Sequence, residues 1–207
     1  MSTIFKSIFI IFCLNFFSCK SDVVETFYTD GTLKESYHVL NDSIKNGEYK
    51  SYNEGGSIFE ISNYQNGSLE GLRQIYLPSG TLDIEEQYRN GVIHGEYKRY
   101  YESGQIKILA HYVDGVLSGE FFKYFPNGVI QEKVTMANNE ENGPFEEFYP
   151  NGKLKWKGQY LNGDNEYGLL ENYDSTGVLI KKMMCDSLRI CKTIWQLDSL
   201  NTEVHKN

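Results

Sequence analysis

Two cysteines near the C-terminus have a spacing that could support chemistry. Cys185 and Cys191 stand in the segment MMCDSLRICKTIW, where two runs of β-forming residues flank four turn residues. In an exported protein this spacing predicts a disulfide that closes a hairpin, and two buried thiols are the alternative. A metal site is not expected from two cysteines without a nearby histidine.

The histidines and the acidic residues indicate no catalytic or metal site. His38, His94, His111 and His205 are far apart in the sequence and lack the spacing of metal ligands. His94 lies in an expected turn, where its repeat equivalents are other polar residues, so we expect a structural role. Adjacent acidic residues on a strand point to opposite faces. We therefore expect no enzyme, no cofactor and no metal.

The first 18 residues have the features of a secretory signal. Lys6 forms a short basic region, and residues 7–17 are an apolar run interrupted by Asn15. The run is shorter than the roughly 20 residues of a spanning helix. It ends in Phe-Phe-Ser-Cys, which resembles a bacterial lipoprotein signal, in which Cys19 would be acylated and become the first mature residue. The alternative is an ordinary secreted protein that is cut nearby.

The charge of the chain limits its partners. The net charge is −8, and removing the signal takes away one lysine and no acidic residue. This balance argues against nucleic acid and against anionic lipid surfaces, because both recruit proteins through clustered lysine and arginine. We expect contact with a membrane only through the lipid anchor, in the bacterial cell envelope.

The composition favours an all-β fold. The chain contains 16 Tyr, 12 Phe and 19 Gly but only 4 Pro, and 40% of it is hydrophobic. An excess of tyrosine and glycine suggests many short strands joined by tight turns, rather than a compact aliphatic core.

Glycines recur at a fixed spacing and define a repeat. A first glycine returns every 24 residues and then once after 25, a second glycine follows nine residues later, and a third, after Asn or Asp, closes the unit. The first set is Gly47, Gly71, Gly95, Gly119, Gly143 and Gly168; the second begins at Gly56; the third is Gly67, Gly91, Gly115 and Gly163, with Asn139 as a substitute. We interpret these glycines as the turns of a β-meander.

The segments between the turns alternate between apolar and polar residues. In residues 106–112 (IKILAHY) the even positions are apolar, which is typical of a strand with one dry and one wet face. A single unit cannot bury its apolar face alone, so neighbouring units must stack. The repeat predicts an elongated antiparallel β-meander of about six 24-residue units.

These units resemble a known repeat family. Residues 88–95 (YRNGVIHG) and 112–119 (YVDGVLSG) are similar to the Tyr-x-Asn-Gly-x-x-x-Gly core of MORN repeats, and more closely to the variant in bacterial YwqK-type antitoxins. The resemblance covers roughly residues 28–179. It implies an elongated antiparallel sheet of hairpins used for protein interaction.

An aromatic row forms the candidate binding surface. Five residues after each first glycine stand Tyr52, Tyr76, Tyr100, Tyr124, Phe148 and Tyr173, and most units also have an aromatic residue two positions after that glycine, as at Tyr49 and Tyr97. The two positions have opposite parity on a strand. Either a bulge brings both rows onto one face, or one row is exposed as a ladder that binds a partner.

The predicted organisation has five parts: a lipoprotein signal peptide (1–18), a tether (19–27), the repeat array (28–179), a capping hairpin (180–200) in which Trp195 covers the last unit, and a frayed tail (201–207). The favoured function is a membrane-tethered scaffold that mediates protein–protein interaction, with an unknown protein partner. The alternatives are an antitoxin or immunity protein that occludes a toxin, and a protein that binds envelope glycans.

Overall fold

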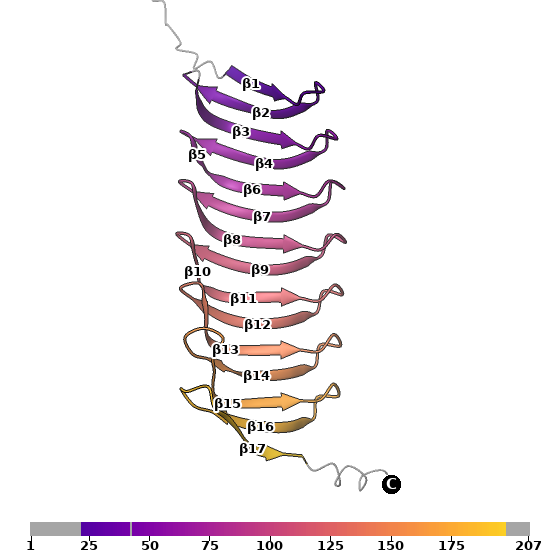
Figure 1. Cartoon of the computed structure of the whole chain (residues 1–207), viewed down its shortest axis with the longest axis vertical. Helices are drawn as coiled ribbons and strands as arrows, with labels where there is room; N and C mark the ends of the chain where they lie inside the picture. Colours follow the sequence, from indigo (N-terminus) through magenta and orange to yellow (C-terminus); the bar gives the residue numbers. More distant parts are fainter. Residues whose placement is uncertain (1–21, 42, 198–207) are drawn as a thin grey trace, which may run out of the picture.

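The computed structural model describes residues 22–41 and 43–197, which form 17 β-strands and no helix (Figure 1). None of these residues belongs to a helix long and apolar enough to cross a membrane. The predicted signal peptide, the predicted lipidation site Cys19 and the predicted tail at 201–207 lie outside the described residues.

The strands follow one another in seven hairpins and a final edge strand. They are β1 (Asp22–Phe27), β2 (Leu33–Leu40), β3 (Ile44–Tyr52), β4 (Ile58–Gln65), β5 (Ser68–Leu69), β6 (Gly71–Tyr76), β7 (Leu82–Arg89), β8 (Val92–Tyr100), β9 (Ile106–Val113), β10 (Val116–Leu117), β11 (Gly119–Tyr124), β12 (Ile130–Ala137), β13 (Glu140–Phe148), β14 (Leu154–Tyr160), β15 (Glu166–Tyr173), β16 (Leu179–Cys185) and β17 (Cys191–Gln196).

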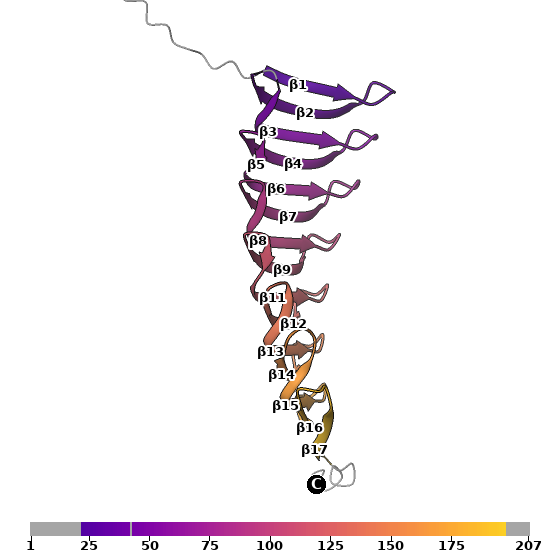
Figure 2. The same cartoon turned by 60° about the vertical axis from the view of Figure 1, so that its left-hand side comes forward.

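All strands belong to one antiparallel sheet in which each strand pairs with its neighbours in sequence. The short strands β5 and β10 are the first segments of β6 and β11, since each segment pairs with the same preceding strand. The hairpins form a stack with β1 at one end and β17 at the other, and Figure 2 shows that they rotate step by step along it. The predicted all-β meander of stacked hairpins is therefore confirmed.

The second glycine of each unit closes a three-residue turn. In residues 125–129 the Gly128 N–H donates to the Phe125 carbonyl at 2.9 Å, and the Phe125 N–H donates to the Val129 carbonyl at 2.8 Å. Gly128 has φ of 81°, the left-handed conformation that this turn needs after a type I turn. The prediction of a hairpin turn at this glycine is confirmed.

The third glycine lies in a two-residue turn with both residues left-handed. Asn90 and Gly91 have φ of 51° and 79°, and in the fifth unit Asn138 and Asn139 have φ of 55° and 68°. These angles are those of a type I′ turn, which suits the twist of a hairpin. Asn139 therefore takes the place of glycine, as the sequence predicts.

The first glycine is not a turn residue, and this part of the interpretation was wrong. Gly95 lies inside β8, where residues 94–96 stand opposite Gln87 alone, between the Glu86–Tyr97 and Tyr88–Ile93 pairs. This bulge holds Gly95 at φ of 118°, and a Cβ atom there would come within 2.4 Å of Oε1 of Gln87. The glycine recurs because each unit bends its first strand at a bulge.

The predicted tether is corrected by the structure. Residues 22–27, assigned to the tether, form β1, whose Val23 and Val24 pair with His38 and Tyr37 of β2. Consecutive β-branched residues favour an extended strand, so the sheet begins before the first recognisable unit.

The C-terminal hairpin is present, but Trp195 does not cover the last unit. β16 pairs with both β15 and β17, and Trp195 stands opposite Lys182 on β17, where it is 41% exposed. β17 is an edge strand, so in the described part of the chain only one neighbour shields its side chains.

The two faces of the sheet differ in burial, and each is named here after a residue of β8. The Tyr97 face includes Tyr97 and its cross-strand partner Ala110, and the Tyr100 face includes Lys98 and Tyr100. The register places the buried apolar side chains of the described residues on the Tyr97 face: Val39, Tyr49, Ala110, Val134, Phe145, Leu170 and Cys185. The predicted dry face is therefore the Tyr97 face, and its apolar core lies in the C-terminal half around Val134 and Leu170.

Candidate functional site

The predicted aromatic row lies on the Tyr100 face. The Tyr76 hydroxyl is 3.2 Å from the side-chain oxygen of Gln74, and the Tyr173 hydroxyl donates to Glu171 at 2.8 Å. Each of these pairs is two residues apart on one strand and so shares a face. Tyr52, Tyr76, Tyr100, Tyr124, Phe148 and Tyr173 are all partly buried.

The second aromatic row lies on the opposite face. Tyr97 and Tyr112 have ring centroids 6.0 Å apart, and Phe145 and Tyr160 have stacked rings 4.2 Å apart, all on the Tyr97 face. The idea that a bulge brings both rows onto one face is therefore wrong. The bulge near the end of each first strand places its extra residue in the second strand, so the alternation along the first strand is unchanged.

Tyrosine hydroxyls tie successive units together beside this row. Tyr28, Tyr101 and Tyr149 each donate a hydrogen bond to a backbone carbonyl in the next unit, at 2.7, 2.6 and 3.0 Å; the acceptors are Tyr52, Tyr124 and Tyr173. Members of the candidate binding row therefore also help to hold neighbouring hairpins in place.

The N-terminal half of the Tyr97 face carries a buried charge network. Arg73 donates two hydrogen bonds to Glu60 and one to Glu86, all at 3.0 Å. Glu60 is only 8% exposed, and Ser62 donates to it at 3.0 Å. The Glu60 carboxylate raises the pKa of Arg73, which keeps its charge. This network connects strands β4, β6 and β7 of two neighbouring hairpins and takes the place of an apolar core there.

A lysine lies over a group of tyrosine rings in the same half. The Lys45 ammonium is 4.6 Å from the ring centre of Tyr37, 4.1 Å from that of Tyr49 and 5.2 Å from that of Tyr64. A cation at these distances is attracted to the negative face of each ring. The Tyr97 face can therefore hold a cation between its aromatic residues.

The fifth unit has an acidic residue at the position of Lys45. Glu141, like Lys45, stands two residues before the first glycine, and beside it lie Phe145 and Tyr160, the equivalents of Tyr49 and Tyr64. Burial raises the pKa of Glu141, and nearby Glu132 adds to the effect. Burial is also the main cause that raises the pKa of Tyr160, and surrounding carboxylates raise it further. The rings and carboxylates here thus share one partly buried environment.

A hollow of about 620 Å³ lies mainly along the Tyr100 face of β11 to β15. Its charged side chains pair with one another: Lys133 contacts Glu120 at 2.6 Å, and Lys157 contacts Glu171 at 2.8 Å. Hydrogen bonds from Lys157 and Lys182 lower the pKa of Glu171 to about 2. The volume suits a small ligand, but these charges neutralise one another.

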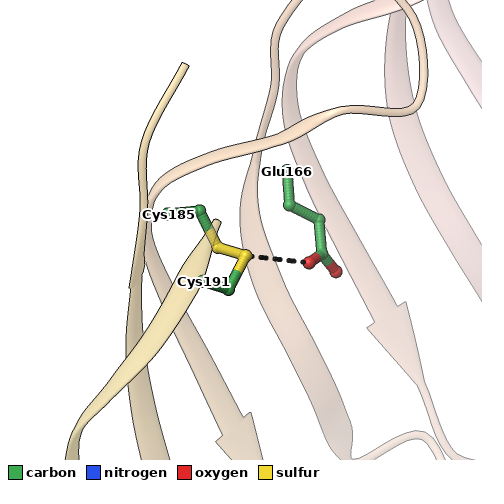
Figure 3. Close-up of side chains that lie close together, drawn as sticks. All are labelled: Glu166, Cys185 and Cys191. Atoms are coloured by element: carbon green, nitrogen blue, oxygen red, sulfur yellow. Dashed lines mark hydrogen bonds between the residues drawn. A yellow bond between two sulfur atoms is a disulfide. The ribbon is translucent and has the colours of Figure 1, made fainter. Parts of the chain in front are cut away.

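The structure joins Cys185 and Cys191 in a disulfide between β16 and β17. Figure 3 shows the Glu166 carboxylate beside it, with Oε2 3.6 Å from Sγ of Cys191. The donor atoms of the three residues lie within 4.8 Å of one another. A metal ion binds the thiolate form of cysteine. Because these two sulfur atoms are bonded to each other, neither is a thiolate ligand.

His94 has a structural contact in its turn. The backbone N–H of Asp114, in the next turn of the stack, donates to Nδ1 of His94 at 3.2 Å. Arg89 also contacts the Asp114 carboxylate, at 2.8 Å. Both interactions link neighbouring turns.

The charged residues of the Tyr97 face were not among the candidate residues predicted from the sequence, although a signal was present. Arg73 stands at a repeat position that is aromatic in most other units. The acidic residues that bind it lie on the two neighbouring strands, where Glu86 is directly opposite Arg73 and Glu60 is opposite Ile75. Lys45 and Glu141 likewise share one repeat position with opposite charges. These residues can be recognised in the sequence because each differs from the residues at the same position in other units.

The comparison with known families agrees with this geometry. A family model described as MORN repeat variant matches residues 45–66, 69–90, 93–114, 117–138 and 141–162, which together are more than half of the chain. No curated protein matches the sequence.

Proposed function

Because the chain belongs to the MORN repeat variant family, whose members are generally interaction scaffolds, we propose that it is a membrane-tethered scaffold that binds a partner protein along its sheet. In this proposal the chain is not an enzyme and uses no cofactor or metal. Among the residues that the structure describes, no group of potential metal ligands includes His38, His94 or His111, which supports this view.

The observation that carries the proposal is the open, single-layer sheet. The strands described here contact their neighbours in the stack, and no described segment packs over either face. Both faces nevertheless carry aromatic side chains, and the Tyr97 face combines an apolar core with charged groups. Extended repeat arrays of this kind bind partners along their length.

The tether in this proposal rests on the N-terminal sequence. The apolar run followed by Phe16-Phe17-Ser18-Cys19 supports acylation of Cys19, and two or more acyl chains give stable attachment to a bilayer. Since Asp22 already belongs to β1, the array would start within a few residues of the anchor. Its distal end would then be β17.

The experiment is crosslinking in cells, followed by mass spectrometry, on the full chain and on a Cys19→Ala variant that loses the anchor. The proposal expects one dominant protein partner, and expects the variant to lose it. Only general envelope proteins, in equal amounts for both chains, would contradict the proposal. If the Cys19→Ala variant loses the partner but keeps the localisation of the full chain, the lipid tether is contradicted and the scaffold is not.

The resemblance to YwqK-type antitoxins extends this proposal to a particular partner, an exported toxin that the sheet would occlude. The supporting residues are the Tyr-x-Asn-Gly core at 88–95 and the similar core with Asp114 in place of Asn at 112–119, which form adjacent turns in the structure. Deleting the protein from cells that carry a neighbouring toxin gene should then be harmful. Growth that is unaffected by the deletion would exclude this partner and leave the scaffold proposal in place.

A further inference from the structure

On the Tyr97 face, the same repeat position holds residues of opposite charge in two hairpins. In the second hairpin the position holds Lys45, whose ammonium lies within 5.2 Å of the centres of three tyrosine rings. In the hairpin β13–β14 it holds Glu141, beside the stacked rings of Phe145 and Tyr160. The first ring group therefore contains a cation of the chain itself, whereas the second has a carboxylate in that place.

Further carboxylates surround the second ring group. Glu166 stands directly opposite Tyr160 in the register of β14 and β15. Glu132 and Asp164 are close enough to Glu141 to raise its pKa, in addition to the effect of burial. Burial is also the first cause of the raised pKa of Glu132. Glu132 and Glu141 lose solvation in the folded chain, whereas Asp164 and Glu166 are exposed. A cation placed beside Glu132 and Glu141 would offset that cost.

The cations near these carboxylates are not paired with them. Among the described residues, Glu132, Glu141, Asp164 and Glu166 take part in no ion pair, in contrast to Glu147, which contacts Lys155 at 3.0 Å. Lys123 is near enough to favour the charged form of Glu132. Arg189 lines a hollow together with Asp164 and Glu166.

That hollow has the size and the acceptors for a basic side chain. Its volume is about 300 Å³, and Tyr160, Asn165 and Cys191 also line it. Glu132 and Glu141 lie beside this hollow and not in its lining, and they act on Tyr160 through their charges. The Oδ1 atom of Asn165 is buried without a hydrogen-bond partner, an arrangement that is unfavourable unless a donor is supplied. Lysine and arginine carry only donors on their charged groups, and their alkyl stems pack on apolar surfaces.

We propose that Tyr160, whose ring stacks on the buried Phe145, and the carboxylates of Glu132, Glu141 and Asp164 form a docking site for a lysine or arginine side chain on a basic segment of the partner protein. The proposal rests on the scaffold function and adds the chemistry of the partner. Charge complementarity selects this occupant: the site combines ring faces with unpaired carboxylates, and the chain places its own Lys45 in the corresponding ring group.

The test uses the full purified chain and a fluorescent peptide, Gly-Ser-Leu-Arg-Leu-Gly-Ser, with a second peptide that has the uncharged isostere citrulline in place of arginine. Anisotropy should show that the citrulline peptide binds at least about tenfold more weakly. The double variant Glu132→Gln, Glu141→Gln should weaken the arginine peptide by about tenfold. The matched control Glu54→Gln, Glu102→Gln removes two exposed turn carboxylates and should change Kd by less than about twofold.

A single substitution provides an independent arm. Glu141→Lys puts a lysine at the position that corresponds to Lys45, so its ammonium should lie over the Tyr160 ring, abolish peptide binding and raise the thermal midpoint. Equal binding of the two peptides, or equal losses in the test and control variants, would overturn the site.

The cell experiment separates this site from the scaffold function. If the double variant Glu132→Gln, Glu141→Gln still captures the native partner as well as the unmodified chain does, the scaffold stands and the basic-segment site is wrong. If the arginine peptide binds with the expected dependence on the two carboxylates but no partner is crosslinked in cells, the site stands and the scaffold function is wrong.

Discussion

Gly158 lies directly against Leu170: a Cβ atom at position 158 would come within 2.1 Å of Cδ2 of Leu170. Leu170 is fully buried, and Phe145, the cross-strand partner of Gly158, would be 2.9 Å from the same Cβ atom. The core of the Tyr97 face therefore depends on a missing side chain in β14, since two large apolar groups occupy the space that it would need.

Gly158→Ala should lower the free energy of unfolding by about 1–3 kcal/mol, because overpacking forces neighbouring side chains or backbone to move. Urea denaturation followed by circular dichroism measures the change. The matched control is Gly55→Ala, which lies in an exposed turn with open space around the added methyl group and no left-handed φ. Equal effects of the two substitutions would contradict the packing argument.

Arg73→Met should cost about 3 kcal/mol, because it leaves two largely buried carboxylates, Glu60 and Glu86, without their cation. Arg99→Met removes a comparable side chain whose partner is Asp83, but that arginine is more exposed. Its expected cost is below about 1 kcal/mol. Thermal unfolding of both variants at neutral pH checks the difference, and a smaller loss for Arg73→Met than for Arg99→Met would refute it.

Glu171 should stabilise the fold in a way that depends on pH. Hydrogen bonds from Lys157 and Lys182 lower its pKa from 4.5 to about 2. A lowered carboxyl pKa contributes stability that is present above 4.5 and is lost as the pH falls toward 2. Unmodified protein should therefore lose stability relative to Glu171→Gln across this window, by on the order of 1 kcal/mol after allowance for solvent screening. Parallel thermal midpoints of the two proteins between pH 6 and about pH 2 would be the contrary result.

Glu132 should behave in the opposite sense, because burial raises its pKa. A raised carboxyl pKa means that the folded state is favoured at low pH and loses stability as the pH rises through the folded value. Glu132→Gln should therefore raise the thermal midpoint at neutral pH and have no such benefit below the ordinary glutamate pKa of 4.5. Melting curves at both pH values check this, and a gain that is equal at the two values would exclude the burial effect.

Loss of the disulfide should loosen β17 and leave the rest of the array intact. Cys185 and Cys191 close a short loop, for which the expected stabilisation is about 2 kcal/mol. In a Cys185→Ser, Cys191→Ser variant, hydrogen exchange should become faster in β17, whose one neighbour among the described strands is β16. Exchange in β3 to β9 serves as the internal control, and faster exchange there would show that the disulfide acts beyond the edge.

The turns and the repeat could be predicted because they depend on local chemistry. Asn90-Gly91 and its equivalents adopt left-handed φ values that few other dipeptides accept, and their spacing sets the length of each strand. The alternation then identified the dry face correctly for residues 108–112, but the bulge at Lys107 places Ile106 opposite Tyr100 on the other face. The same reasoning failed at Gly95, since a glycine in a strand bulge and a glycine in a turn look alike in sequence.

The candidate site, by contrast, followed from contacts between residues about one repeat apart. Glu141, Tyr160 and Glu166 become neighbours only when three strands align in register, and the face of each aromatic row depends on which strand of a hairpin holds the extra residue of its bulge. A shift of one residue would reverse every side chain on a strand. Local sequence therefore set the hairpins and their repetition, whereas the pairing of distant strands decided which rings, carboxylates and cations share a face.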